Sequence, residues 1–135
     1  FQSILKILLD TDVWIWWVSG DNQLGVTAKA LIAHSENEVF FSAISSWEIA
    51  IKHSMGKLKL PKEPKKLLYN AITSNDFKIL PIQVEHTLHI IGLPNYHSDP
   101  FDRLLISQAQ IEGLHIITGD TKIMRYDVAI FDARK

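Results

Sequence analysis

The stretch ILKILLDTD, residues 4–12, decides the fold of this chain of 135 residues. Its first six residues form a mainly apolar run, which is typical of a strand that is buried on both faces, as in parallel sheets. Asp10 follows this run directly. Because the carboxyl ends of parallel strands face one crevice at the edge of a sheet, an acid in this position indicates a ligand site.

Three further acids lie beside apolar runs or one step into the helix that follows. Glu48 lies in SAISSWEIAIK, Asp102 lies in HSDPFDRLLISQAQ, and Asp120 directly follows LHIITG. Strand patterns alternate with helical patterns along the chain, which predicts an α/β fold with a mainly parallel sheet and right-handed crossovers. In such a sheet we expect all four acids at one edge.

A cluster of four carboxylates has a chemical consequence. Carboxylates that are held together repel one another unless protons or cations intervene. Mg²⁺ and Mn²⁺ are cations that prefer oxygen ligands of this kind. The pattern therefore predicts a divalent cation at Asp10, Glu48, Asp102 and Asp120, and with it metal-assisted phosphoryl chemistry.

The composition fits one folded domain. Hydrophobic residues make up 47% of the chain, which is enough for a core, and the formal net charge is −1. The chain has no cysteine, so disulfides and thiolate metal sites are excluded. The apolar runs are too short to cross a bilayer, and we expect a cytoplasmic protein without membrane contact. Residues 1–3 look like an expression-tag remnant, and residues 4–135 are expected to form a single domain.

The periodicity of apolar residues predicts the individual elements. Strands are expected at residues 4–9, 39–42, 78–80, 115–118 and 128–131. Helices are expected to begin near 13–18 and to cover 27–34, 45–55, 65–74, 84–93 and 101–112, with a short helix after Asp120. Asp99 is expected to cap the helix that Pro100 opens, and Gly113 is expected to end it.

Three of the four acids have a specific structural alternative. Glu48 could complete a capping box with Ser45, or it could pair with Lys52 one helical turn later. Asp102 is an acid in the first turn of a helix, where the helix dipole favours negative charge. Asp120 could cap the next helix. Helix capping alone would not place an acid near the end of four different strands. We therefore favour the interpretation that the four acids form one site.

Four segments in order resemble the PIN domain, in the branch typified by VapC toxins of bacterial toxin–antitoxin pairs. They are ILKILLDTDVWIWW, SAISSWEIAIKHSMGKLKL, HSDPFDRLLISQAQIEGLHIITGD and MRYDVAIFDA. The resemblance implies a three-layer α/β/α PIN-like fold with a central sheet of four to five strands. It also implies a ribonuclease that depends on Mg²⁺ or Mn²⁺ and hydrolyses RNA phosphodiester bonds, as the toxin that a cognate antitoxin protein covers.

The family's acidic quartet falls on Asp10, Glu48, Asp102 and Asp120. In the DPFDR segment, the aspartate directly before Arg103 matches the metal-binding position, so Asp102 is chosen over Asp99, which is kept as a supporting residue.

Other side chains near the quartet could support it. Thr11 and Thr118 flank acids and could hydrogen-bond a water, a carboxylate or a phosphate. Arg103 could hold a phosphate or orient an acid, with an ordinary ion pair as the alternative. Asp12 stands where many relatives carry histidine, and it could cap a helix or contribute to metal binding. His97 is expected to make a polar contact rather than to catalyse.

Candidate contacts for RNA and for partner chains lie elsewhere in the sequence. Six lysines against one acid fall between residues 52 and 66, which is either a solvated face or a strip that follows phosphates, with Lys52, Lys57 and Lys59 as candidates. PIN-domain proteins commonly form homodimers. An apolar first helix with Trp14 and Trp17 on one face is compatible with a homodimer.

Three other functions compete with this interpretation. Asp10-Thr11-Asp12-Val13 resembles the motif of haloacid-dehalogenase-like phosphatases, in which the first aspartate is a nucleophile and the second an acid/base. That alternative leaves Glu48 and Asp102 unexplained. A receiver-like signalling domain normally needs a lysine after its last strand, where this chain has Phe131-Asp132-Ala133. A non-catalytic binding module is the third alternative.

Overall fold

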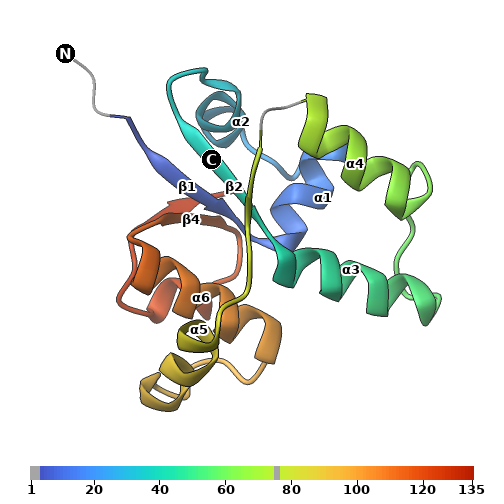
Figure 1. The fold of residues 1–135 in the computed structure, drawn as a ribbon. Coiled ribbons are helices and arrows are strands. Elements are labelled where there is room, and N and C mark those ends of the chain that lie inside the picture. Colours follow the sequence, from blue (N-terminus) through green and yellow to red (C-terminus); the bar gives the residue numbers. More distant parts are fainter. Residues whose placement is uncertain (1–3, 75–76) are drawn as a thin grey trace.

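The fold is built on one parallel sheet, seen in a computed structural model that describes residues 4–74 and 77–135. The strands are β1 (Lys6–Leu9), β2 (Glu38–Ser42), β3 (Lys78–Leu80), β4 (His115–Thr118) and β5 (Ile130–Asp132). They lie in the order β3-β2-β1-β4-β5, and every neighbouring pair is parallel (Figure 1). The predicted sheet is confirmed, whereas the predicted tag remnant at residues 1–3 lies outside the described residues.

Helices cover both faces of this sheet. They are α1 (Thr11–Ser19), α2 (Val26–Ala33), α3 (Ala43–Ser54), α4 (Pro64–Ser74), α5 (Val84–His89) and α6 (Pro100–Glu112), with the 3-10 helices η1 (Ile90–Gly92) and η2 (Ile123–Arg125). Successive residues of β1 point to opposite faces, so Ile7 and Leu9 join the core under α1, α2 and α4, while Leu8 joins the core under α6. The three-layer α/β/α arrangement is therefore confirmed (Figure 1).

The position of β1 brings distant parts of the chain to one edge. β1 lies between β2 and β4, and Leu9 is in register with Ile117 of β4. The backbone N–H of Asp10 still donates to the carbonyl of Ile117, at 3.2 Å, so the chain leaves both strands at the same level. The order of connections reverses at β1, which is where open α/β sheets have their ligand crevice.

Two helix starts differ from the prediction. Asp10, not Asp12, caps α1, because its side chain accepts hydrogen bonds from the backbone N–H groups of Asp12 and Val13. Ser42 caps α3 by accepting from the backbone N–H of Ile44. The predicted capping box at Ser45 is therefore wrong, since the helix begins before it and the Ser45 side chain is buried. Both helices start directly at a strand end, without an intervening loop.

The other boundaries agree with the prediction to within a few residues. The predicted helix 84–93 is divided into α5 and the 3-10 helix η1, and the short helix expected after Asp120 is the 3-10 helix η2. The last strand starts two residues later than predicted. Element ends are where sequence patterns are least informative, because terminal turns tighten or fray. Among the described residues, no helix is both long and apolar enough to span a bilayer.

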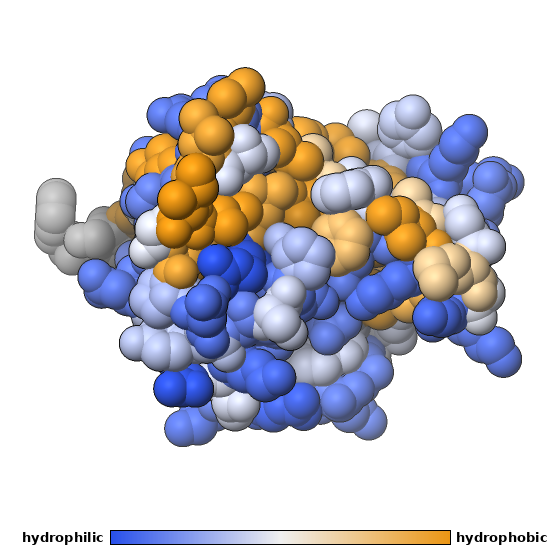
Figure 2. Space-filling model, turned by 90° about the horizontal axis from the view of Figure 1, so that it is seen from below, coloured by the Kyte–Doolittle hydropathy of each residue, from blue (hydrophilic) through white to orange (hydrophobic). Residues whose placement is uncertain are grey.

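The apolar side chains of α1 are mostly used inside the fold. Trp14 is fully buried against Phe41, and the ring of Trp17 packs on Phe77. The predicted homodimer therefore gains little support from α1. Figure 2 shows apolar side chains gathered on another face of the molecule. The exposed apolar residues include Ile82, Val84, Leu88 and Ile91 of the segment through α5 and η1.

Candidate active site

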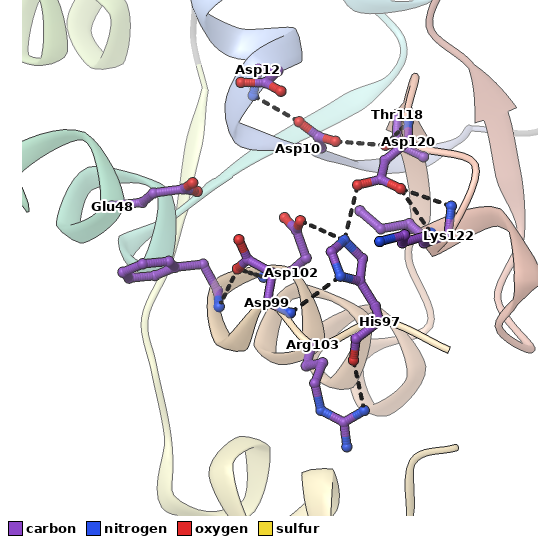
Figure 3. Close-up of polar contacts among 12 residues, drawn as sticks. Asp10, Asp12, Glu48, His97, Asp99, Asp102, Arg103, Thr118, Asp120 and Lys122 are labelled. Carbon is purple, nitrogen blue, oxygen red and sulfur yellow. Dashed lines mark hydrogen bonds and ion pairs between the residues drawn. The ribbon is translucent and has the colours of Figure 1, made fainter. Parts of the chain in front are cut away.

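A cavity of about 190 Å³ opens at the carboxyl edge of the sheet. We call it the carboxylate pocket, and its lining residues are Asp10, Thr11, Asp12, Glu48, Lys52, His97, Asp99, Asp102 and Asp120. All four predicted acids are brought together in it, from segments that are far apart in the sequence. Figure 3 shows the side chains of Asp10, Glu48 and Asp102 turned toward one shared space.

Asp10 is the most tightly held of these acids. One carboxylate oxygen caps α1, and the other accepts a hydrogen bond from the Thr118 hydroxyl at 2.5 Å. The residue is only 5% exposed. Burial raises the pKa of Asp10 to about 6, and the hydrogen bonds from Thr118 and the backbone offset that effect only in part. The predicted supporting contact from Thr118 is present.

Glu48 brings a second carboxylate from α3 into the pocket. Its Oε2 atom accepts a hydrogen bond from Lys52 Nζ at 2.6 Å, as predicted for residues one helical turn apart. Its Oε1 atom is buried, and in the described part of the chain no hydrogen-bond donor reaches it. A buried carboxylate oxygen without a partner is costly, so this atom marks a position where a ligand would be stabilising.

Asp102 enters from the first turn of α6. Asp99 caps this helix, with its Oδ1 atom accepting from the backbone N–H groups of Phe101 and Asp102, as predicted. The pKa of Asp102 is raised to about 8. Burial is the largest cause, and the nearby carboxylates of Asp10, Asp99, Glu48 and Asp120 add to it. The repulsion between carboxylates that the sequence pattern predicted therefore acts on Asp102.

Asp120 differs from Asp102 because several donors surround it. Burial alone would raise the pKa of Asp120. However, hydrogen bonds from His97 and from the backbone N–H groups of Lys122 and Ile123 outweigh that effect and place the pKa below its usual value. The sequence analysis expected only a polar contact from His97. In the structure its Nε2 atom lies 2.9 Å from both Asp102 Oδ2 and Asp120 Oδ2.

The other supporting candidates, Asp12 and Thr11, make different contacts. Asp12 lines the pocket, and burial followed by the Glu48 and Asp120 carboxylates raises its pKa, while Lys52 opposes the shift. Thr11 hydrogen-bonds the buried hydroxyl of Ser45 at 2.8 Å, which fixes α1 against α3.

In the described part of the chain Arg103 makes no hydrogen bond or ion pair to an acid, and its contact with a phosphate stays a prediction. Its guanidinium donates to the backbone carbonyls of Pro94 and His97, and it thereby holds the loop before α6.

The predicted lysine strip is divided by the structure. Lys52 lies in the carboxylate pocket and pairs with Glu48. Lys57 and Lys59 are exposed on the segment between α3 and α4. The strip as an RNA contact therefore stays a prediction, and of the three candidate lysines Lys57 and Lys59 are the exposed ones.

The donor set of the pocket fits a divalent cation. Asp102 and Asp120 each offer a carboxylate oxygen, and these oxygens and a ring nitrogen of His97 lie within 4.8 Å of one another. Glu48 adds a buried oxygen that has no partner in the part of the chain that the structure describes, and the pKa of Asp102 is raised by burial and by the other carboxylates. A cation would relieve both conditions at once, and a set dominated by carboxylate oxygens suits Mg²⁺ or Mn²⁺.

Comparison with known proteins agrees with this geometry. The family described as the PIN domain matches residues 7–129, which is most of the chain. This chain belongs to the PIN-domain family. This chain is similar to Ribonuclease VapC22 of Mycobacterium tuberculosis (strain ATCC 25618 / H37Rv), with 25% identity over 118 residues that cover 87% of this chain and 88% of that protein.

Solved structures share the fold of this PIN domain. VapBC2 from Rickettsia felis, bound to a DNA fragment from its promoter, aligns with a TM-score of 0.69 and 16% identity over 94% of this chain and 98% of that chain. FitAB bound to an IR36 DNA fragment aligns with a TM-score of 0.66 and 23% identity over 96% of each chain. The phosphatase and receiver-like alternatives are not favoured, because the matched family is a different one.

Proposed function

We propose that this PIN domain is an endoribonuclease that depends on Mg²⁺ or Mn²⁺, hydrolyses RNA phosphodiester bonds, and is the toxin of a toxin–antitoxin pair. The observation that carries the proposal is the carboxylate pocket, in which a buried Glu48 oxygen has no hydrogen-bond partner among the described residues while neighbouring carboxylates repel Asp102. Similarity to Ribonuclease VapC22 supports RNA as the substrate. Similarity to VapBC2 and FitAB supports an antitoxin as the protein partner.

In this proposal, Asp10, Glu48 and Asp102 hold the cation, with Asp120 beside them. A divalent cation bound there supplies Lewis acidity and a water of lowered pKa for attack on phosphorus. The chain itself fixes the carboxylates. Thr118 and the first turn of α1 orient Asp10, while Lys52 neutralises one oxygen of Glu48 and leaves the other facing the pocket.

The decisive experiment is cleavage of total RNA by the purified protein, with Mg²⁺ or Mn²⁺ compared with EDTA, beside Asp10→Asn. We expect cleavage that requires the metal and is lost in the variant, because the variant removes one ligand charge but keeps an oxygen that can cap α1. Cleavage in EDTA, or undiminished cleavage by the variant, would contradict the proposal. A phosphatase assay on the same samples tests the alternative that uses Asp10 and Asp12 as nucleophile and acid/base.

The approach of the RNA strand can be tested separately. We infer that Lys57 and Lys59 contact phosphates, because both are exposed on the α3–α4 segment that adjoins Lys52 of the pocket. Reversing both charges with Lys57→Glu and Lys59→Glu should make the decrease of the log binding constant with log salt less steep by about 1.4, that is about 0.7 for each lost phosphate contact. Lys29→Glu on α2 is the matched control, and an equal effect there would remove the assignment.

Two further partner predictions accompany the proposal. The cognate antitoxin is expected to cover the carboxylate pocket. A homodimer is also expected, and size measurement at high micromolar concentration tests it. A purely monomeric protein under those conditions would contradict the homodimer without affecting the proposed chemistry.

A further inference from the structure

His97 occupies a bridging position that the acidic quartet alone does not explain. Its Nε2 atom lies 2.9 Å from Oδ2 of Asp102 on α6 and 2.9 Å from Oδ2 of Asp120 after β4 (Figure 3). The side chain is only 9% exposed. One ring nitrogen therefore joins carboxylates from two separate elements at the edge of the pocket.

The hydrogen bonds of the ring assign its hydrogen to one nitrogen. Nδ1 lies 3.2 Å from the backbone nitrogen of Asp99, whose N–H group donates to it. A backbone N–H can only donate, so Nδ1 presents a lone pair and the hydrogen of the neutral ring is on Nε2. Nε2 therefore donates to Asp120 Oδ2, while Asp102 Oδ2 lies within ion-pair distance of the same nitrogen. A metal-binding histidine has the opposite arrangement, because it binds through a lone pair and donates from its other nitrogen.

The surrounding loop is built to keep His97 in this place. The backbone N–H of His97 donates to the Tyr126 hydroxyl at 3.0 Å, and its carbonyl accepts from Arg103 at 3.2 Å. Arg103 and Tyr126 both donate to the carbonyl of Pro94, at 3.0 and 2.7 Å. Tyr126 is only 4% exposed. The loop that carries His97 is thus held from α6 and from the segment after η2.

We propose that His97 is a positioning residue that donates its Nε2 hydrogen to Asp120, lies against Asp102 at ion-pair distance, and holds these two carboxylates at the spacing that the cation requires. An ionised carboxylate has about four lone-pair positions, so it can accept from His97 and bind a cation at the same time. This inference rests on the proposed function, because it assumes that the pocket binds a cation.

The test is calorimetric titration of the full chain with Mn²⁺ alone, without RNA. We expect His97→Ala to weaken Mn²⁺ binding by about 10–100-fold, the range typical for partners of metal ligands. His97→Gln should recover most of the affinity, because its amide can donate from a comparable position. His89→Ala, which removes an exposed histidine bonded to Gln110 outside the pocket, is the matched control and should bind as wild type does.

A spectroscopic measurement separates positioning from direct ligation. Pulsed electron paramagnetic resonance of bound Mn²⁺ detects a directly bonded nitrogen. We expect none in the wild-type protein and the same spectrum in His97→Gln. A directly bonded nitrogen in the wild type that is lost in His97→Gln would overturn the inference, and this comparison remains decisive if His97→Ala does not fold.

The outcomes also separate this inference from the proposed function. A wild-type protein that binds no Mn²⁺ would contradict the metal-dependent function itself. Wild-type binding that is unchanged in His97→Ala would overturn only the role of His97. Binding that is equally weak in His97→Ala and His97→Gln would also overturn it, because hydrogen-bond donation would then not be the cause.

Discussion

Two polar clusters are buried near each other in this protein, and they are built on opposite rules. The first is the carboxylate pocket. The second, which we call the Gln108 network, consists of Ser42, His86, Ser107 and Gln108, all fully buried. Ser42 donates to Gln108 Oε1 at 2.6 Å, and Gln108 Nε2 donates to the carbonyl of Pro81 at 3.0 Å. The network joins β2, α5 and α6 through paired donors and acceptors.

The two clusters differ in whether their buried polar atoms have hydrogen-bond partners. In the Gln108 network Ser107 donates to the carbonyl of His86, and His86 Nδ1 accepts from the backbone N–H of Gln83. In the carboxylate pocket Glu48 Oε1 has no partner among the described residues, and burial and neighbouring carboxylates raise the pKa of Asp102. A satisfied network stabilises the fold by itself, whereas an unsatisfied cluster gains its stability from a ligand.

His86 also clarifies which carboxylate groups are candidate metal sites. Glu85, His86 and Glu112 offer ligand atoms within 4.8 Å of one another, as the pocket residues do. However, Nδ1 of His86 accepts from a backbone N–H, so its hydrogen is on Nε2 and faces Glu112 at 3.4 Å. Proximity of ligand types therefore does not distinguish a metal site, and the unpaired oxygen at Glu48 does.

The largest expected effect comes from removing one charge of the pocket. Asp102→Asn should lower RNA cleavage by more than about 100-fold, beyond the usual loss for a partner of a metal ligand. Asp127→Asn, an exposed acid outside the pocket, is the control. Circular dichroism should be unchanged in both. Full activity of Asp102→Asn would mean that the carboxylate pocket, like the Gln108 network, has only a structural role.

Metal binding should stabilise the protein through the pocket alone. At a Mn²⁺ concentration 100 times the dissociation constant, the free energy of unfolding should rise by about 3 kcal/mol. Thermal melting with and without Mn²⁺ measures this rise. It should disappear in Asp102→Asn, because the ligand set is then incomplete. A rise of the same size in that variant would show that the cation binds elsewhere.

Breaking the Gln108 network should lower stability without affecting the metal. Gln108→Ala leaves the Ser42 hydroxyl and the Pro81 carbonyl without their buried partner, which should cost about 1–3 kcal/mol. Denaturant unfolding measures that cost, and calorimetry with Mn²⁺ should give an unchanged dissociation constant. A large loss of metal affinity would mean that the two clusters are coupled through β2 and α3.

The smallest expected effect is a pH dependence of the metal-free protein. The pKa values of Asp10 and Asp102 are raised from 3.8 to about 6 and about 8. Their contribution to stability is therefore present below the unfolded pKa and is lost as pH rises through the folded values. Melting temperatures in EDTA should therefore fall between pH 5 and pH 9. Asp102→Asn should flatten the fall, and a rise with pH would contradict these shifts.

Sequence patterns determined the framework of this site. Apolar runs that alternate with helical segments predicted a parallel sheet, and they placed Asp10, Glu48, Asp102 and Asp120 at its edge. These predictions held because strand burial and helix starts depend on residues that are near one another in the chain. Strand order and the exact caps of α1 and α3 did not follow, because both are set by contacts between elements.

The tertiary structure alone decided how the acids are held. His97 and Asp120 are 23 residues apart, Thr118 and Asp10 are 108 apart, and no local pattern links either pair. From the sequence, Arg103 could hold a phosphate, orient an acid or form an ion pair, whereas in the structure its guanidinium donates to backbone carbonyls of the loop before α6. The unpaired oxygen of Glu48 is likewise a property of the packed pocket, because it depends on which donors fail to reach a buried atom.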